Sequence, residues 1–278
     1  MEIGHSHLIA ALASTPWCMR AEMFKTFETV LNNKFTLGLN VTQLKQDDFG
    51  SAKKGNSASV KKGVAVVKMH GTLLKKAYCM DTASGGTRTL EDVQRDLRNA
   101  YSDPEVGGIL LDIESGGGGV PGTAETARLI ADIKETKPVI GLAGGYMCSG
   151  AYWIGSACSE LYCSNTTEVG SIGVYQTHIS MAKVLEEEGI KVTLIKAGKQ
   201  KALGNQYTDL TEEDLSILQQ RIDNLYNIFM SEVAGYRGVS FDKVKSEWAD
   251  ARLFTGEEAV RAGLVDDIAT VDEILNSF

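Results

Sequence analysis

The sequence lacks a basic excess, a cysteine framework and a long hydrophobic run, and each absence excludes a class of protein. The formal net charge is −8. This value argues against a general nucleic-acid binder, which usually carries a basic face. No run approaches the ~20 apolar residues of a membrane-spanning helix, and the N-terminus, MEIGHSHLIAALASTPW, lacks the basic start of a secretory signal. We therefore expect a cytoplasmic protein that binds neither nucleic acid nor membrane.

The cysteines exclude a disulfide scaffold and a zinc-binding framework. There are five, at positions 18, 79, 148, 158 and 163, without a CxxC pair. An odd number with no framework indicates a reducing compartment, where such residues usually serve as small buried hydrophobes. Hydrophobic residues make up 43% of the 278 residues and charged ones 23%, as in an ordinary globular protein. A chain of this length can bury a large core without covalent staples.

Charge and composition divide the chain in two. Residues 1–62 hold eight Lys and Arg against five Asp and Glu, a net charge of +3, so the remainder carries −11. Apolar residues at three- and four-residue spacings over 6–33 predict two short helices broken near Pro16. The small and charged residues of 45–63 indicate a linker. We predict a helical N-terminal arm, residues 1–62, and a main domain, residues 63–278.

Strand-like and helix-like segments alternate in the main domain. Short apolar and β-branched runs predict strands at 63–73, 107–115, 138–145, 160–165 and 191–198. Amphipathic or apolar runs predict helices at 89–106, 123–137, 149–158 and 211–238, the first with Thr89 as its N-cap. This alternation is typical of an α/β fold with a mostly parallel sheet and helical cover.

The segment GGYMCSGAYWIGSAC, residues 144–158, places Ser149 among small residues at a predicted strand-to-helix turn. A hydroxyl exposed there can meet a substrate, and the N–H groups of the first helical turn point toward a developing oxyanion. Small neighbours let a peptide backbone approach closely and favour small or apolar side chains at the reacting position. A capping or packing role for Ser149 is the alternative that the local pattern leaves open.

A second unusual segment is ESGGGGVPG, residues 114–122, which directly follows a predicted strand. Four successive glycines cost backbone entropy, so they indicate unusual dihedral angles or the close approach of another chain. The GxxxxGK[ST] pattern of a phosphate loop is absent, and the loop holds no lysine. A flexible hairpin remains the other interpretation.

Serine needs a base to become a useful nucleophile. None of the four histidines, at 5, 7, 70 and 178, stands in a motif that places it near Ser149. A lysine can serve instead when burial or nearby positive charge lowers its pKa, as in Ser-Lys pairs. The residues alone do not choose one lysine.

Six segments in the same order resemble the S49 serine peptidases, the signal peptide peptidase A family. They span residues 63–268 and read GVAVVKMHGTL, GGILLDIESGGGGV, GGYMCSGAYWIGSACSELYCSNTTEVGSIGV, IKAGKQKAL, LTEEDL and ADARLFTGEEAVRAGLVDDI. The resemblance implies the fold shared by Clp protease and crotonase. It also implies a ring-like homo-oligomer whose sites face an inner groove and take extended peptides.

The resemblance also implies roles for individual residues. Ser149 matches the nucleophile, and Lys201 in IKAGKQKAL matches the general base, with Lys196 and Lys199 as rivals. Ser171 in VGSIGV matches the serine that helps to hold the lysine. The implied reaction is hydrolysis of a peptide bond and requires no metal or nucleotide cofactor.

The remaining implied roles fall on glycines. The backbone N–H groups of Gly117 and Gly150 match the donors of the oxyanion hole. The sequence departs from the family at Gly116, which stands where the family usually has a proline that stiffens the loop. The departure concerns the rigidity of the loop, because the N–H donors remain.

The segment HLIAALASTPWCMRAEMFKTFETVL resembles the leader of phage-encoded members of the family, the minor capsid or prohead proteases. These are packaged with portal and scaffold and cleave them during head maturation. The resemblance implies a protein substrate, a capsid scaffold or portal as partner, and a location in the host cytoplasm or prohead. Three alternatives stay open: a cytoplasmic S49 enzyme that degrades peptides, a crotonase-like acyl-CoA enzyme, and an inactive scaffold-binding protein.

Overall fold

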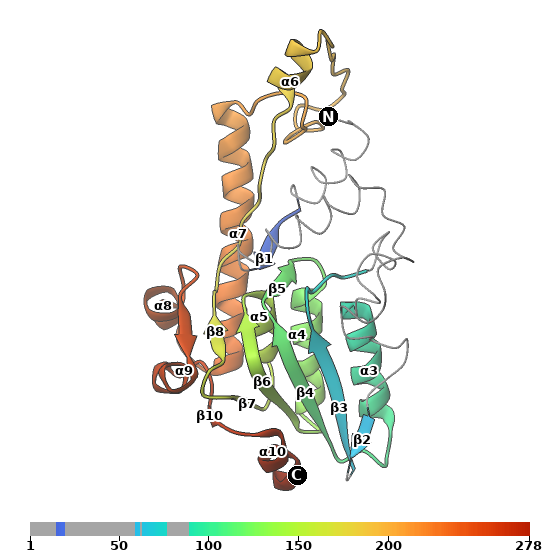
Figure 1. The fold of residues 1–278 in the computed structure, drawn as a ribbon, viewed down its shortest axis with the longest axis vertical. Helices are drawn as coiled ribbons and strands as arrows, with labels where there is room; N and C mark the ends of the chain where they lie inside the picture. Colours follow the sequence, from blue (N-terminus) through green and yellow to red (C-terminus); the bar gives the residue numbers. More distant parts are fainter. Residues whose placement is uncertain (1–14, 20–58, 62, 77–88) are drawn as a thin grey trace.

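A computed structural model describes residues 15–19, 59–61, 63–76 and 89–278, and one large sheet organises them (Figure 1). The strands of the sheet are β2 (Ser59–Lys61), β3 (Val64–His70), β4 (Gly108–Ser115), β6 (Val139–Cys148), β7 (Glu160–Cys163), β8 (Glu168–Gly170), β9 (Leu253–Thr255) and β10 (Asp267–Ile268). They lie in the order β10-β7-β6-β4-β3-β2, and β8 pairs with both β6 and β9.

The pairings make the sheet mostly parallel. Neighbours from β3 through β4, β6 and β7 to β10 run parallel, as does β8 beside β6. Only β2 on β3 and β9 on β8 are antiparallel within this sheet of described strands. The predicted α/β class with a mostly parallel sheet is therefore confirmed. The finer Clp protease/crotonase-like assignment stays a prediction.

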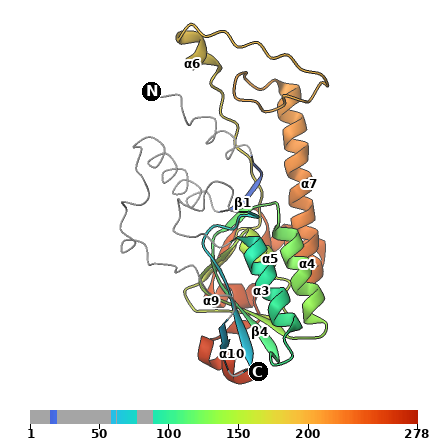
Figure 2. The same ribbon diagram turned by 90° about the vertical axis from the view of Figure 1, so that its right-hand side faces the viewer.

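Helices cover both faces unequally (Figures 1 and 2). They are α3 (Leu90–Ser102), α4 (Thr123–Lys134), α5 (Gly150–Gly155), α6 (Ala182–Glu187), α7 (Glu212–Arg237), α8 (Phe241–Lys243), α9 (Gly256–Ala262) and α10 (Val271–Ser277), with a π-helical turn at Val244–Trp248. The main core lies between one sheet face and α3, α4, α5 and the end of α7. A smaller core on the other face includes Ile274 of α10.

Local chemistry explains where these helices begin. Thr89 caps α3 as predicted: its side chain accepts a hydrogen bond from the Asp92 backbone, and Asp92 bonds back to the Thr89 N–H at 3.0 Å. The same reciprocal box opens α7 at Thr211. Such caps satisfy donors that a helix start otherwise leaves unpaired.

Three sequence predictions are wrong. Residues 59–61, which were predicted as part of a linker, form strand β2 and pair with β3. Residues 191–198 form no strand; 191–196 have no regular structure, and all eight are exposed. Trp17–Met19 form a strand, β1, where a helix was predicted, because they pair antiparallel with β5 (Gly117–Gly119) of the main domain. The rest of the predicted helical arm and most of its linker lie outside the described residues, so the boundary at residue 62 stays a prediction.

A long projection extends beyond the sheet. It comprises residues 176–211, including α6, and the first half of α7 (Figures 1 and 2). Every buried residue of α7 lies at or after Phe229, so only the second half of this helix packs on the core. None of the helices in the described part of the chain combines the length and apolar character that a bilayer crossing requires.

Candidate active site

Ser149 occupies a sharp turn between the end of β6 and the start of α5. Its backbone has φ 55° and ψ −121°, a conformation that non-glycine residues adopt only under strain. The turn is held from both sides. The Ser149 N–H donates to the Gly170 carbonyl at 2.7 Å, and the Ser149 carbonyl accepts from the Trp153 N–H at 2.9 Å. Strain of this kind at a strand-to-helix turn is typical of nucleophilic serines.

The helix behind Ser149 is locked in the core. All six residues of α5 are buried. Trp153 stacks on Phe229 of α7 with ring centroids 4.4 Å apart, and its Nε1 donates to Glu232 at 2.8 Å. The Tyr152 hydroxyl donates to the Leu264 carbonyl at 3.0 Å. These contacts fix the turn on a rigid element, as a precise site requires.

The Ser149 hydroxyl itself is covered and weakly bonded. The residue is 1% exposed. Within the described residues, its Oγ has one hydrogen-bond partner, the Gly173 carbonyl at 3.5 Å, and no basic side chain bonds to it. The hydroxyl is therefore available for chemistry once a base and a substrate reach it.

Ser171 lies beside the same turn. It follows Gly170, whose carbonyl binds the Ser149 N–H, and it also has positive φ, 54°. The Ser171 N–H donates to the Arg252 carbonyl at 2.6 Å, and the residue is 7% exposed. The structure thus places the two predicted serines on adjoining, strained turns.

The glycine stretch forms β5, which lies between two other backbone segments. On one side Leu73 donates to the Gly117 carbonyl at 3.0 Å, and on the other β1 pairs Cys18 with Gly118. A Cβ on Gly118 would lie 1.9 Å from the Leu73 oxygen. The glycines therefore allow the close approach of other backbone segments of this chain, whereas the approach of another chain stays a prediction.

The predicted oxyanion-hole glycines come together. A Cβ on Gly117 would lie 3.1 Å from the Gly150 nitrogen and 2.2 Å from the Cys18 oxygen. The Gly117 N–H, however, donates to Ser115 Oγ at 3.1 Å. The neighbouring Gly118, which sequence reasoning did not single out, has its N–H beside the Cys18 thiol. A run of identical glycines gives no signal of which N–H faces the site.

The Cys18 thiol lies beside the backbone of Gly118 and Gly150. Burial raises its pKa to about 12, and Thr123 and the N–H groups of Gly118 and Gly150 act in the opposite direction. Geometry places the same groups together, since a Cβ on Gly150 would lie 2.7 Å from the Cys18 sulfur and 3.6 Å from the Gly118 nitrogen. The thiol remains protonated and behaves as a small apolar side chain.

Lys201 lies apart from these residues. It is exposed, in the segment between α6 and α7, which Figure 1 shows at the top of the molecule, whereas α5 lies near the middle of the long axis. The side chains of the two alternative lysines both make hydrogen bonds. Lys199 pairs with Glu213, and this hydrogen bond raises the Lys199 pKa, which favours the protonated form. Lys196 Nζ donates to the Lys199 carbonyl at 3.1 Å.

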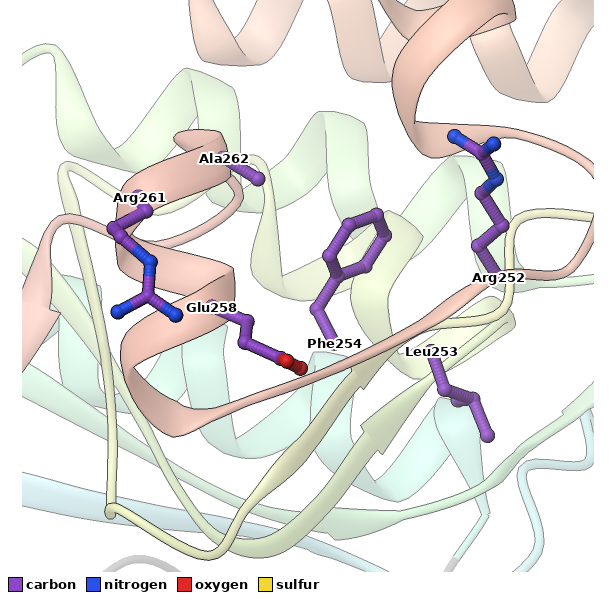
Figure 3. A pocket seen from close by; sticks show the side chains of 6 residues that line it. All are labelled: Arg252, Leu253, Phe254, Glu258, Arg261 and Ala262. Atoms are coloured by element: carbon purple, nitrogen blue, oxygen red, sulfur yellow. The ribbon is translucent and has the colours of Figure 1, made fainter.

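A surface hollow beside β9 and α9 contains none of the predicted site residues (Figure 3). Its lining side chains are Arg252, Leu253, Phe254, Glu258, Arg261 and Ala262. Glu258 is bound to the Thr255 N–H at 3.2 Å, and Arg261 pairs with Glu257 at 3.2 Å. Across the described residues, no group of three or more His, Cys, Asp or Glu side chains could hold a metal ion.

Comparisons with known proteins match this chain to a peptidase family and to phage proteins. The sequence profile of peptidase family S49 matches residues 131–278, a range that contains Ser149, Ser171 and Lys201 but not Gly117. The chain is 36% identical over 225 residues to capsid assembly protease C of Escherichia phage lambda, covering 81% of this chain and 50% of that protein. It is 32% identical over 285 residues to the head-tail preconnector protein GP5 of Enterobacteria phage P21, covering 98% of this chain and 56% of that protein.

A more distant relative belongs to a plant. The serine protease SPPA, chloroplastic, of Arabidopsis thaliana is 27% identical over 206 residues, covering 74% of this chain and 30% of that protein. The chain spans about half the length of the two phage relatives.

Proposed function

Because the chain belongs to peptidase family S49, we propose that it is a serine endopeptidase with Ser149 as its nucleophile. The observation that carries the proposal is the strained turn that sets Ser149 between β6 and the buried helix α5. Beside it lies a glycine strand that accepts another backbone in antiparallel pairing. A nucleophile next to a surface that binds extended chains is what peptide hydrolysis requires.

The proposed reaction uses only groups of the protein and water. Ser149 Oγ attacks the carbonyl carbon of the peptide bond while Lys201 takes its proton. The oxyanion is stabilised by backbone N–H groups of Gly150 and of Gly117 or its neighbour Gly118. Lys201 then gives the proton to the leaving amine, and water releases the acyl group from Ser149. Ser171 is proposed to hold the lysine.

Lys201 is proposed to reach Ser149 from another copy of the chain. The projection that carries it exposes several apolar side chains, and Ile195 is 96% exposed. The others are Ile179, Val184, Ile190, Val192 and Leu194. Clustered apolar exposure is typical of surfaces that pack on a partner. A homo-oligomer in which each projection contacts a neighbour would bury this surface and desolvate the lysine, which lowers a lysine's pKa.

The proposed substrate is a capsid or scaffold protein presented as an extended segment. The names of the phage lambda and phage P21 relatives refer to capsid assembly and to the head-tail preconnector. The enzyme would then act in the host cytoplasm or the prohead, with scaffold or portal as partner.

A serine-directed fluorophosphonate probe tests the nucleophile. Wild type should be labelled on Ser149, and Ser149→Ala should not. Ser246→Ala changes an exposed serine near the C-terminal end of the chain and is the matched control; it should label as wild type does. Labelling of Ser149→Ala at the wild-type rate would overturn the assignment.

Mixing two inactive variants tests how the site is completed. Ser149→Ala and Lys201→Ala are each expected to be inactive toward an unfolded protein substrate. If the lysine comes from a neighbouring copy, mixed oligomers at equal ratio should recover about a quarter of wild-type activity, since half of the serines and half of the lysines are intact. A mixture that stays inactive after subunit exchange would mean that one chain supplies both residues.

A further inference from the structure

The short strand β1 lies between two backbone segments beside the turn of Ser149, and the space that it fills is called the groove below. It pairs with β5 through Trp17–Gly119, Cys18–Gly118 and Met19–Gly117. On its other side Trp17 exchanges two hydrogen bonds with Tyr175, at 2.8 and 2.9 Å. β5 and the backbone at Tyr175 are therefore the two walls that hold β1 by hydrogen bonds, and both lie far along the chain from it.

Both walls belong to the candidate active site. β5 carries Gly117 and Gly118, which are proposed as oxyanion donors, and Tyr175 lies two residues after Gly173, whose carbonyl accepts from Ser149 Oγ at 3.5 Å. The Cys18 carbonyl lies close to Gly117 and Gly150, because a Cβ on either glycine would come within 2.2 Å and 3.3 Å of its oxygen. A substrate with its reacting carbonyl between the same donors would have to occupy the same space.

The side chains of β1 alternate as those of a bound peptide would. Cys18 points to the small space beside Gly118, Gly150 and Thr123, where a Cβ on Gly150 would lie only 2.7 Å from its sulfur. Trp17 and Met19 face the other way and form a small apolar cluster with Leu74 and Tyr175. Trp17, Cys18 and Met19 are 1%, 0% and 4% exposed.

We propose that β1 is an internal inhibitory strand, which occupies the peptide cleft in the orientation of a substrate and must leave before Ser149 can meet another chain. The proposal rests on the proposed function, since it takes this groove as the substrate cleft. It also defines the preferred peptide: a small uncharged side chain at the position of Cys18, between bulky apolar side chains at the positions of Trp17 and Met19.

Release of the strand is the first test. Trp17→Asp in the full chain places a charge in the apolar cluster and should free β1. Fluorophosphonate labelling of Ser149 should become at least about tenfold faster than in wild type, since the competent open state becomes the major one. The matched variant Trp17→Phe keeps the apolar contact and should label close to the wild-type rate. Provided that wild type is labelled at a measurable rate, labelling of folded Trp17→Asp at the same rate would contradict the proposal.

A disulfide lock tests the same point without depending on that variant. Trp17 and Tyr175 exchange both backbone hydrogen bonds, a pairing with Cα atoms about 5.5 Å apart, within the range that a disulfide spans. In Trp17→Cys/Tyr175→Cys, oxidation should slow labelling at least about tenfold relative to the reduced protein. Each single variant should not respond to the oxidant. Equal labelling of the cross-linked and reduced forms, with the bond verified by mass spectrometry, would overturn the proposal.

Peptide binding separates this inference from the proposed chemistry. A fluorescent peptide ASTPWCMR, residues 13–20, should bind Trp17→Asp/Ser149→Ala and not Ser149→Ala alone, as measured by fluorescence anisotropy. Alanine at the position of Cys18 should preserve binding and tryptophan should abolish it. Binding without any labelling or cleavage by Trp17→Asp would refute the proposed function and support β1 as the occupant of the groove. Equal binding to both proteins, or to neither, would refute the inhibitory strand.

Discussion

The serine and the lysine of the proposed dyad lie in regions built in opposite ways. Ser149 stands on α5, all of whose residues are buried, and its turn is held by backbone hydrogen bonds from two sides. Lys201 stands on a projection with exposed apolar side chains and no packed core of its own among the described residues. If the two residues act as proposed, the nucleophile is preorganised within one chain, whereas the base would acquire its environment only when a partner covers the projection.

The largest expected effect concerns the reaction itself. Ser149→Ala should lower peptide cleavage by at least about 10³-fold, and the double variant Ser149→Ala/Lys201→Ala should be no worse, because residues that act as a unit are not additive. The melting temperature of Ser149→Ala should stay near that of wild type, since among the described residues the Ser149 hydroxyl makes one long hydrogen bond, to Gly173. A double variant clearly less active than either single variant would separate the two regions functionally.

The next effect contrasts stability in the two regions. Trp153→Ala should lower the free energy of unfolding by about 3–5 kcal/mol, because it removes a fully buried ring stacked on Phe229. Ile195→Asp should change it by no more than about 0.5 kcal/mol, since the side chain is exposed. Ile195→Asp should nevertheless lose assembly and cleavage. Urea unfolding and analytical ultracentrifugation measure the two properties; an assembled, active Ile195→Asp would contradict the role of the projection.

A smaller effect compares how tightly side chains pack around two glycines, one in β6 and one in α7. Gly141→Ala should cost about 1–3 kcal/mol, because its Cβ would lie 2.6 Å from Leu161 Cδ1 and 3.1 Å from Cys158 Sγ. Gly235→Ala on α7 should instead stabilise by about 0.5–1 kcal/mol, because nothing lies within 4 Å of the added carbon and alanine favours a helix. Thermal melts of the two variants should shift in opposite directions.

The smallest effect is the pH dependence of the cap of α3. Partial burial acts to raise the pKa of Asp92, but hydrogen bonds from Thr89 and from Arg95 outweigh it and hold the pKa below the usual 3.8. A depressed pKa gives stability that is present above the unfolded pKa and lost as pH falls through the folded one. Asp92→Asn should therefore lower the urea midpoint at about pH 5 and make little difference near about pH 2. If the difference in urea midpoint between wild type and Asp92→Asn is the same at both pH values, the depressed pKa of Asp92 does not contribute to stability as described.

Much of the sheet and its helical cover could be predicted from sequence, because the patterns that indicate these strands and helices are local. Apolar runs such as those of β4 and β6 are buried by neighbours that follow within the next few dozen residues, and the Thr89 cap lies within one turn of its partner Asp92. The turn at Ser149 was indicated by small residues between a strand-like and a helix-like run. In these places local preference and the final fold agree.

The errors occur where structure depends on distant or absent partners. Trp17–Met19 have helix-compatible spacing, but β5, a hundred residues later, holds them extended. Residues 191–198 have the β-branched pattern of a strand, yet no strand of the described chain lies beside them to bond with. Lys201 was named only through a family resemblance, because nothing local distinguishes it from Lys196 and Lys199.

The pairing of β1 also has a consequence for the order of folding. Cys18 pairs with Gly118, and Trp17 bridges to Tyr175, 158 residues downstream. During synthesis the N-terminal segment leaves the ribosome first but has no place to dock until both walls exist, and such long-range contacts form slowly. A newly folded chain should pass through a stage with its groove still open. In refolding experiments, Ser149 should be labelled by the fluorophosphonate most rapidly at early times, before β1 closes the groove.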